Sequence, residues 1–328
     1  MKTAVKNIGR ILAPMLAAGF FATIPGCRED AESPTAPEAT PALSTASAPL
    51  SFSRISVGGQ HTCGVTTDNR AYCWGYGVWG QIGDGAARSK TRRPSLVAGP
   101  HFVQVTAGLE HTCGLTADNR AYCWGQNNTG RLGDGTTTNR STPVLVAGGR
   151  RFRQIRAGAY HTCAVNLYDV AFCWGDNIYA QLGDGTTTQR LVPVRVLGGL
   201  SIRSVIAGGT HTCAVTTSDR AYCWGRNEEG QLGTGTTIGR GKPIPVAGGL
   251  SFRSVIAGSS HSCGVTTGDR PFCWGENEDG ELGDGSHTSR LTPVPVAGTR
   301  RFRQVIAGYL HTCGVTLSDV AFCWGSEF

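Results

Sequence analysis

A unit of about 50 residues recurs six times along this chain and constrains the fold more than any other feature. Each unit carries a His-Thr/Ser-Cys motif, followed after a short turn by Cys-Trp-Gly. A strict period of this length is typical of solenoids, propellers and other repeat arrays. The repeated side chains are His61, His111, His161, His211, His261 and His311, with Trp74, Trp124, Trp174, Trp224, Trp274 and Trp324.

Four short strands are expected in every unit, separated by clusters of Gly, Asn, Asp and Ser. Helix-period apolar patterns are missing, and the 47 glycines suit an all-β protein. In the fourth unit the expected strands cover Ile202–Ile206, His211–Thr216, Arg220–Trp224 and Pro243–Val246. Four strands per repeat predict a β-propeller blade. In five units we expect the last strand to begin at a proline: Pro94, Pro143, Pro193, Pro243 and Pro293.

The number of units favours a propeller of six blades, with a seven-bladed or an incomplete ring as alternatives. The last unit reaches Phe328 directly after Trp324-Gly325, so no fourth strand follows within it. Propellers normally close by pairing a strand from one terminus with the blade at the other. The candidate is Thr40-Pro41-Ala42-Leu43, which resembles Thr292-Pro293-Val294-Pro295.

Residues 1–26 are expected to be a signal peptide, because a basic start precedes a short apolar run. The run ends in Ile24-Pro25-Gly26-Cys27, which resembles the lipobox of bacterial lipoproteins and implies a lipid on the sulfur of Cys27. Ordinary secretion with an unpaired cysteine is the alternative. Residues 27–50 are rich in Pro, Ala, Ser and Thr and are predicted to form a tether. Residues 51–328 then form the repeat domain.

The paired cysteines of each unit are expected to form a disulfide across a hairpin. A turn centred on Asp68 places Cys63 opposite Cys73, Gly64 opposite Tyr72 and Thr62 opposite Trp74. Export permits disulfides, and each loop would contribute a little under ~3 kcal/mol. Metal binding by His and Cys is the alternative. The pairs are Cys63–Cys73, Cys113–Cys123, Cys163–Cys173, Cys213–Cys223, Cys263–Cys273 and Cys313–Cys323.

The other repeated residues are interpreted as structural. An active site needs one asymmetric constellation, whereas the histidines recur in six equivalent places, so we expect them to hydrogen-bond neighbouring blades. The tryptophans are expected in the core between blades. The Gly-Asp-Gly segments at Asp84, Asp134, Asp184 and Asp284 lack the acidic ladder of a calcium loop and are predicted to be turns. No catalytic residue, metal or cofactor is expected.

The repeat resembles that of the regulator of chromosome condensation family. The similarity lies in Ala207-Gly208-x-x-His211-Thr212 and in Tyr222-x-Trp224-Gly225-x-Asn227-x-x-Gly230-Gln231-Leu232-Gly233. It covers residues 51–328 in six copies. The resemblance implies a β-propeller, usually of seven blades, and functions as different as nucleotide exchange on a GTPase, light sensing and inhibition of β-lactamases. The paired cysteines depart from the nuclear pattern and suit an exported branch, so fold alone does not determine function.

Strand order assigns the loops to two opposite faces. The aromatic rim comprises the loops from first to second and from third to fourth strands. Its apolar residues have no role in the repeat. They are the predicted binding surface, with packing on neighbouring loops as the alternative: Tyr76, Trp79, Leu109, Tyr160, Ile178, Tyr179, Tyr309 and Leu310. The arginine rim comprises the hairpin turns and blade connections, and it carries Arg150, Arg151, Arg153, Arg300, Arg301 and Arg303, with Arg70, Arg120, Arg220 and Arg270 at turn ends.

These observations predict a non-enzymatic lipoprotein, anchored in the periplasm or on the cell surface, whose propeller binds a protein or glycan. Units one, three and six would form one apolar arc on the aromatic rim if residues 41–43 complete the last blade. Removing Lys2, Lys6 and Arg10 lowers the formal net charge from +7 to +4, which gives no support for nucleic-acid binding. The alternatives are a nucleotide-exchange regulator and a propeller enzyme acting on glycans.

Overall fold

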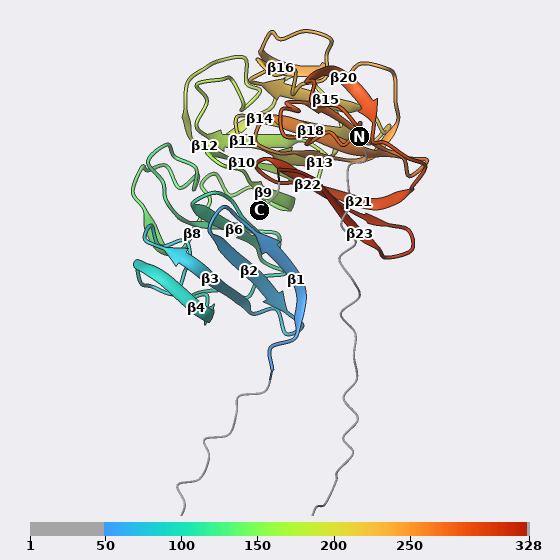
Figure 1. Ribbon diagram of the computed structural model, residues 1–328. Coiled ribbons are helices and arrows are strands. Elements are labelled where there is room, and N and C mark those ends of the chain that lie inside the picture. The colour runs from blue at the N-terminus through green and yellow to red at the C-terminus, as the bar shows by residue number, and fades with distance from the viewer. Residues whose placement is uncertain (1–48, 327–328) are drawn as a thin grey trace, which may run out of the picture. The chain divides into compact units, whose positions relative to one another are not determined.

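The computed structural model describes residues 49–326, which form 23 β-strands in six separate antiparallel sheets (Figure 1). Each sheet corresponds to one sequence unit, with its strands paired in chain order. Five sheets have four strands and the last has three. The predicted all-β propeller with six blades is therefore confirmed. Within this part of the chain there is no helix long and apolar enough to cross a membrane.

The first three blades contain twelve strands. They are β1 (Phe52–Val57), β2 (His61–Thr66), β3 (Ala71–Gly77), β4 (Arg88–Leu96), β5 (Gln104–Ala107), β6 (His111–Leu115), β7 (Ala121–Gly125), β8 (Arg140–Leu145), β9 (Phe152–Ala157), β10 (His161–Asn166), β11 (Ala171–Gly175) and β12 (Arg190–Arg195).

The last three blades contain the other eleven. They are β13 (Ile202–Ala207), β14 (His211–Thr216), β15 (Ala221–Gly225), β16 (Arg240–Pro245), β17 (Phe252–Ala257), β18 (His261–Thr266), β19 (Pro271–Gly275), β20 (Arg290–Pro295), β21 (Phe302–Ala307), β22 (His311–Thr316) and β23 (Ala321–Gly325).

The fourth strands begin earlier than predicted. The strand expected at Pro243 starts at Arg240, whose partner across the ladder is Gly225, and the proline lies inside it. The prediction that proline opens this strand was wrong. Proline is tolerated there because the fourth strand is the outer edge of its sheet, where a missing N–H breaks no second ladder.

Successive blades pack through the faces of their sheets. First strands contact each other from blade to blade, so they lie innermost. Phe152, Ile155 and Trp174 of the third blade join one buried cluster with Leu115 and Cys123 of the second. The same arrangement repeats at the other junctions between consecutive blades. The prediction that the tryptophans belong to the core between blades is confirmed for the second to sixth blades, whereas the half-buried Trp74 of the first blade belongs to none of these clusters.

The central hairpins have the predicted register. Cys63 is paired with Cys73, Gly64 with Tyr72 and Thr62 with Trp74. The ring that lies over Gly64 is Phe52 on β1, since a Cβ at Gly64 would meet its Cδ1 at 2.5 Å. Six disulfides join the predicted cysteine pairs, with Cα–Cα distances of 4.0–4.1 Å. The alternative expectation, that these cysteines bind a metal ion, was wrong, because each pair cross-links its own hairpin.

The signal peptide, the lipidated Cys27, the tether up to residue 48 and the closing strand at Pro41 to Leu43 lie outside the described residues. They stay predictions.

Candidate functional site: two rims of the propeller

Each of the first five repeated histidines ties its blade to the next. His161 Nε2 lies 2.8 Å from Thr212 Oγ1, and that hydroxyl donates to the carbonyl of Gln181 at 2.7 Å. Because the hydroxyl proton is already used, the histidine must be the donor, which fixes its tautomer with the proton on Nε2. Equivalent pairs are His61–Thr112, His111–Thr162, His211–Ser262 and His261–Thr312. The predicted bonding between blades is confirmed.

These histidines are suited to structure and not to proton transfer. Burial lowers the pKa of His61 and His261 to about 4 and the pKa of His161 and His211 to about 3. Each ring therefore stays neutral near pH 7. No group of three His, Cys, Asp or Glu side chains suited to a metal ion occurs between residues 49 and 326.

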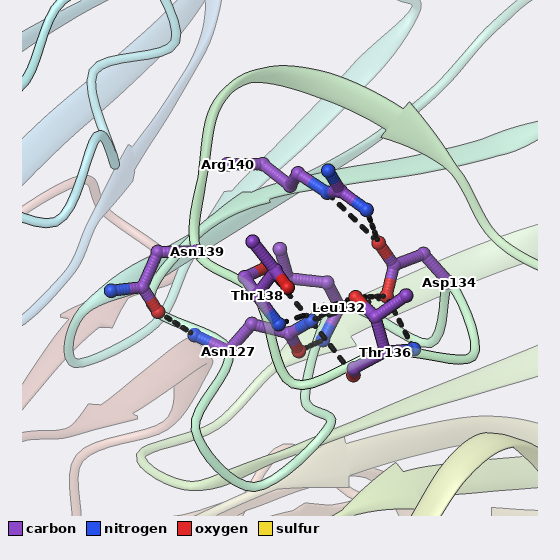
Figure 2. Close-up of polar contacts among 7 residues, drawn as sticks. All are labelled: Asn127, Leu132, Asp134, Thr136, Thr138, Asn139 and Arg140. Carbon is purple, nitrogen blue, oxygen red and sulfur yellow. Dashed lines mark hydrogen bonds and ion pairs between the residues drawn. The ribbon is translucent and has the colours of Figure 1, made fainter.

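The loops from third to fourth strands are locked by a repeated polar network, shown for the second blade in Figure 2. The Asn127 side chain donates to the carbonyls of Thr136 (2.9 Å) and Thr138 (3.1 Å) and accepts from the Leu132 N–H. Asp134 accepts from Thr136 on one carboxylate oxygen and from Arg140 on the other. The predicted Gly-Asp-Gly turns are thus the anchor points of these loops.

Hydrogen bonds keep the Asp134 carboxylate charged. Burial alone would raise its pKa, but the bonds from Thr136 and Arg140 hold that pKa below its usual value. The third and fifth blades repeat the network around Asp184 and Asp284. The fourth blade keeps the asparagine and the loop with Thr234 in place of the aspartate.

The aromatic rim carries the predicted binding residues, and neighbouring blades hold several of them. Of these residues, Ile178 and Tyr179 lie on a loop that is locked by the network just described. Trp79 Nε1 donates to Glu110 Oε1 at 3.2 Å. The Arg131 guanidinium lies 5.5 Å from the centre of the Tyr160 ring, and the Arg226 guanidinium lies 5.3 Å from that of Tyr179. These contacts link blades one to four in order.

The remaining predicted residues differ in exposure. Ile178 and Tyr309 are 64 % and 72 % exposed. Tyr76, Leu109 and Leu310 are half-buried. The observed links run through blades one, two, three and four, whereas the predicted arc joined blades six, one and three through a closing strand that lies outside the described part of the chain.

The aromatic rim becomes acidic towards the fifth blade, where Glu228, Glu278 and Asp279 are exposed. Burial, together with the negative charges of Glu281 and Glu229, raises the pKa of Glu276. Burial likewise raises the pKa of Glu281. This end of the rim therefore repels anions.

The arginine rim is assembled as strand order predicts. Arg151, in the connection before β9, donates to the Asp118 carboxylate in the neighbouring hairpin turn at 2.7 Å. Arg153, Arg203, Arg253 and Arg303 each pair with the turn aspartate of their own blade. Arg153, Arg203 and Arg253 also donate to backbone carbonyls of the following blade. Part of the positive charge on this face thus fastens the blades together.

Sequence reasoning missed three exposed apolar side chains on the arginine rim. Leu167 and Tyr168 lie at the tip of the third hairpin and are 48 % and 84 % exposed, and Leu317 at the tip of the sixth is 53 % exposed. The other hairpin tips have Thr or Ala at the leucine position. That departure from the repeat was the signal that could have revealed them.

Comparison with known proteins assigns the family. The model of the RCC1-like domain matches residues 25–314. The chain belongs to the RCC1-like domain family. A search of the curated proteins by sequence found no match.

Solved structures share the fold of this RCC1-like protein. Prp20p from Saccharomyces cerevisiae superposes with a TM-score of 0.73 at 24 % identity, covering 83 % of this chain and 71 % of that one. Human WBSCR16 gives a TM-score of 0.71 at 22 % identity, with 84 % and 72 % covered. The CRINKLY ectodomain of the Arabidopsis thaliana receptor kinase ACR4 gives 0.56 at 21 % identity, with 85 % and 81 % covered.

Proposed function

We propose that this protein is a non-enzymatic, exported lipoprotein whose aromatic rim binds a protein partner. The main support for this proposal is that side chains of adjoining blades hold Trp79, Tyr160 and Tyr179 at the surface. Rings that are already fixed lose little conformational freedom on binding, which favours affinity. Aromatic side chains are also the commonest energetic centres of protein interfaces.

Two further features support a binding role. The loop that carries Tyr179 is anchored by the network of Asn177, Asp184 and Arg190, so its tip is presented on a rigid base. The fold is shared with Prp20p, whose structure was described with its binding to Gsp1p and histones. A glycan ligand is the other outcome that the experiment below can return.

The proposed site predicts that Trp79→Ala and Tyr179→Ala each weaken partner binding about tenfold or more, as truncation of an interface centre does. Both side chains lie on the rim, outside the core between blades, so the melting temperature should change little. The measurement is cross-linked capture from cell-envelope extract, with a glycan array run beside it. Affinity for the captured partner is then determined for each variant.

Tyr168→Ala on the opposite rim is the matched control, and it should leave partner binding unchanged. If both rim variants lower the melting temperature and spare binding, the rings serve packing and the proposal is wrong. Lipidation is tested separately, by the mass of the N-terminal peptide of the exported chain and its loss in Cys27→Ser.

A further inference from the structure

Seven arginines of the arginine rim neutralise its six turn aspartates, and five further arginines remain. Every aspartate of this rim, from Asp68 to Asp319, already has an arginine partner. Five exposed arginines of the rim have no ion pair with a carboxylate among the described residues: Arg150, Arg220, Arg270, Arg300 and Arg301. The rim therefore has a surplus of positive charge.

Fixed contacts keep four of these guanidinium groups on the rim. Arg220 and Arg301 donate to the carbonyls of Gly249 and Gly268, in the connection and turn that form this face. Arg150 and Arg300 lie 4.8 Å and 4.5 Å from the ring centres of Phe172 and Phe322. Carbonyl and ring contacts leave the full charge in place, so these groups remain available to an anionic surface.

Apolar tips accompany the charge in two blades only. The third and sixth blades carry both the paired arginines before the first strand and a leucine at the hairpin tip. Leu317 and Arg301 are in direct contact, because the Leu317 N–H donates to the Arg301 carbonyl. Leu317, Arg300 and Arg301 also line one hollow of about 480 Å³. Leu167 and Tyr168 form the corresponding projection on the third blade.

This combination matches the interface of a bilayer. Anionic headgroups attract arginine, while tyrosine and leucine at loop tips enter the boundary between headgroups and acyl chains. The chain also enters the propeller on this face, because the Thr67 N–H in the first hairpin turn donates to the carbonyl of Ser51. The acidic end of the aromatic rim lies on the opposite face and would be repelled by the same surface.

We propose that the arginine rim is a membrane-facing surface that docks on anionic phospholipid headgroups, with Leu167, Tyr168 and Leu317 as its anchors. Its orientation rests on the proposed function in one respect: a lipid on Cys27 holds the domain near the bilayer. Docking then turns the aromatic rim away from the membrane and towards its partner.

The test uses the chain purified after export and carrying Cys27→Ser, so that no attached lipid contributes. Co-sedimentation is measured with vesicles of phosphatidylcholine containing one-third phosphatidylglycerol, and with pure phosphatidylcholine. We expect binding to the anionic vesicles alone, and its loss as salt rises from about 0.1 M to about 0.5 M. No binding to anionic vesicles, or equal binding to both kinds, would overturn the proposal.

Three variants locate the surface. Replacing Arg150, Arg220, Arg270, Arg300 and Arg301 by glutamine should weaken binding about 100-fold or more, since each basic residue contributes roughly fivefold near an anionic surface. The control removes the same charge from exposed positions on outer strands: Lys90, Arg92, Arg93, Arg195 and Lys242 to glutamine. It should weaken binding less than about threefold. Equal losses in the two quintuple variants would overturn the assignment to this rim.

The anchors are tested by giving them the residues of other blades, Leu167→Thr, Tyr168→Ser and Leu317→Thr, which the repeat itself accepts at hairpin tips. This triple variant should weaken binding to the anionic vesicles at about 0.1 M salt at least about tenfold. Unchanged binding would show that Leu167, Tyr168 and Leu317 do not anchor the protein, and this part of the proposal would be wrong. Because no lipid is attached, failure here is separate from failure of lipidation or of partner binding.

Discussion

Ile155, on the first strand of the third blade, is fully buried, whereas Ile55 at the same position of the first blade is 59 % exposed. Trp124, Trp174, Trp224 and Trp274 are likewise fully buried, while Trp74 and Trp324 are half-buried. The first and third blades have the same four-stranded pairing, whereas the sixth blade, which holds Trp324, has three strands. The comparison of the first and third blades therefore shows that burial of these positions comes from the adjoining blade, as in other repeat proteins.

Acid should produce the largest effect on the junctions between blades. Above pH 6.5 the five tying histidines are neutral in both the folded and the unfolded chain. As the pH falls from 6.5 towards 4, the unfolded chain takes up protons that the folded chain does not bind. Burial lowers the pKa of four of these rings to about 3–4 and the pKa of His111 well below its usual value. Each histidine then costs up to about 1.4 kcal/mol per pH unit.

Urea unfolding at a series of pH values between 7.5 and 4.5 measures this slope. We expect stability to fall steeply below pH 6.5, before most carboxylates take up protons. A His161→Gln variant, which lacks one titrating ring, should be less stable at neutral pH but have a shallower slope. A flat profile down to pH 4.5 would contradict the account of the histidines.

A matched pair of isoleucine variants compares a junction between two blades with the first blade of the chain. Ile155→Ala removes a fully buried side chain and should cost about 2–5 kcal/mol. Ile55→Ala changes the same residue at an exposed position and should cost less than about 1 kcal/mol. Chemical unfolding of both variants is the measurement. Equal losses would mean that another surface covers Ile55.

The loss of stability on removing a disulfide should differ least between the third blade, which has a neighbour on each side, and the sixth blade at the end of the described chain. Cys163–Cys173 and Cys313–Cys323 close loops of the same sequence separation of 10, so the chain-entropy model assigns each about 3 kcal/mol. Replacing Cys163 and Cys173 by alanine should cost about 1 kcal/mol more, since both are fully buried, whereas Cys313 is half-buried and Cys323 is exposed. Unfolding of both double variants under oxidising conditions tests this. A much larger difference would show that burial, not loop closure, carries the stabilisation.

The repeat allowed most of the scaffold to be predicted from the sequence. A fixed period, a small residue at position 64 opposite an aromatic one and paired cysteines determined blade count, hairpin register and disulfides. The start of the fourth strands could not be predicted, because an outer edge strand tolerates the proline that was expected to open it. Edge position depends on the sheet and not on local sequence.

The sites were harder to predict for a physical reason. Strand order placed the aromatic residues on one rim, but which neighbour holds each ring depends on packing between blades, as with Arg131 over Tyr160. Tyr168 could not be predicted in the same way, because it stands alone in a hairpin turn and not among the aromatic residues of the rim loops. The turn requires a left-handed backbone at Asp169 (φ 61°) and places no requirement on the preceding side chain, that of Tyr168.

The loop network of Figure 2 separates the residues that hold the loop from those at its tip. Its bonds join the two stems of the loop, Asn127 near the start and Arg140 at the end. The two residues at the tip, Asn128 and Thr129, take no part in it and accept hydrogen bonds from Arg131 instead. The fourth blade keeps its loop even with Thr234 in the anchor position. Substitutions at the loop tips can therefore change the exposed surface of the rim while the bonds that hold the loop remain in place.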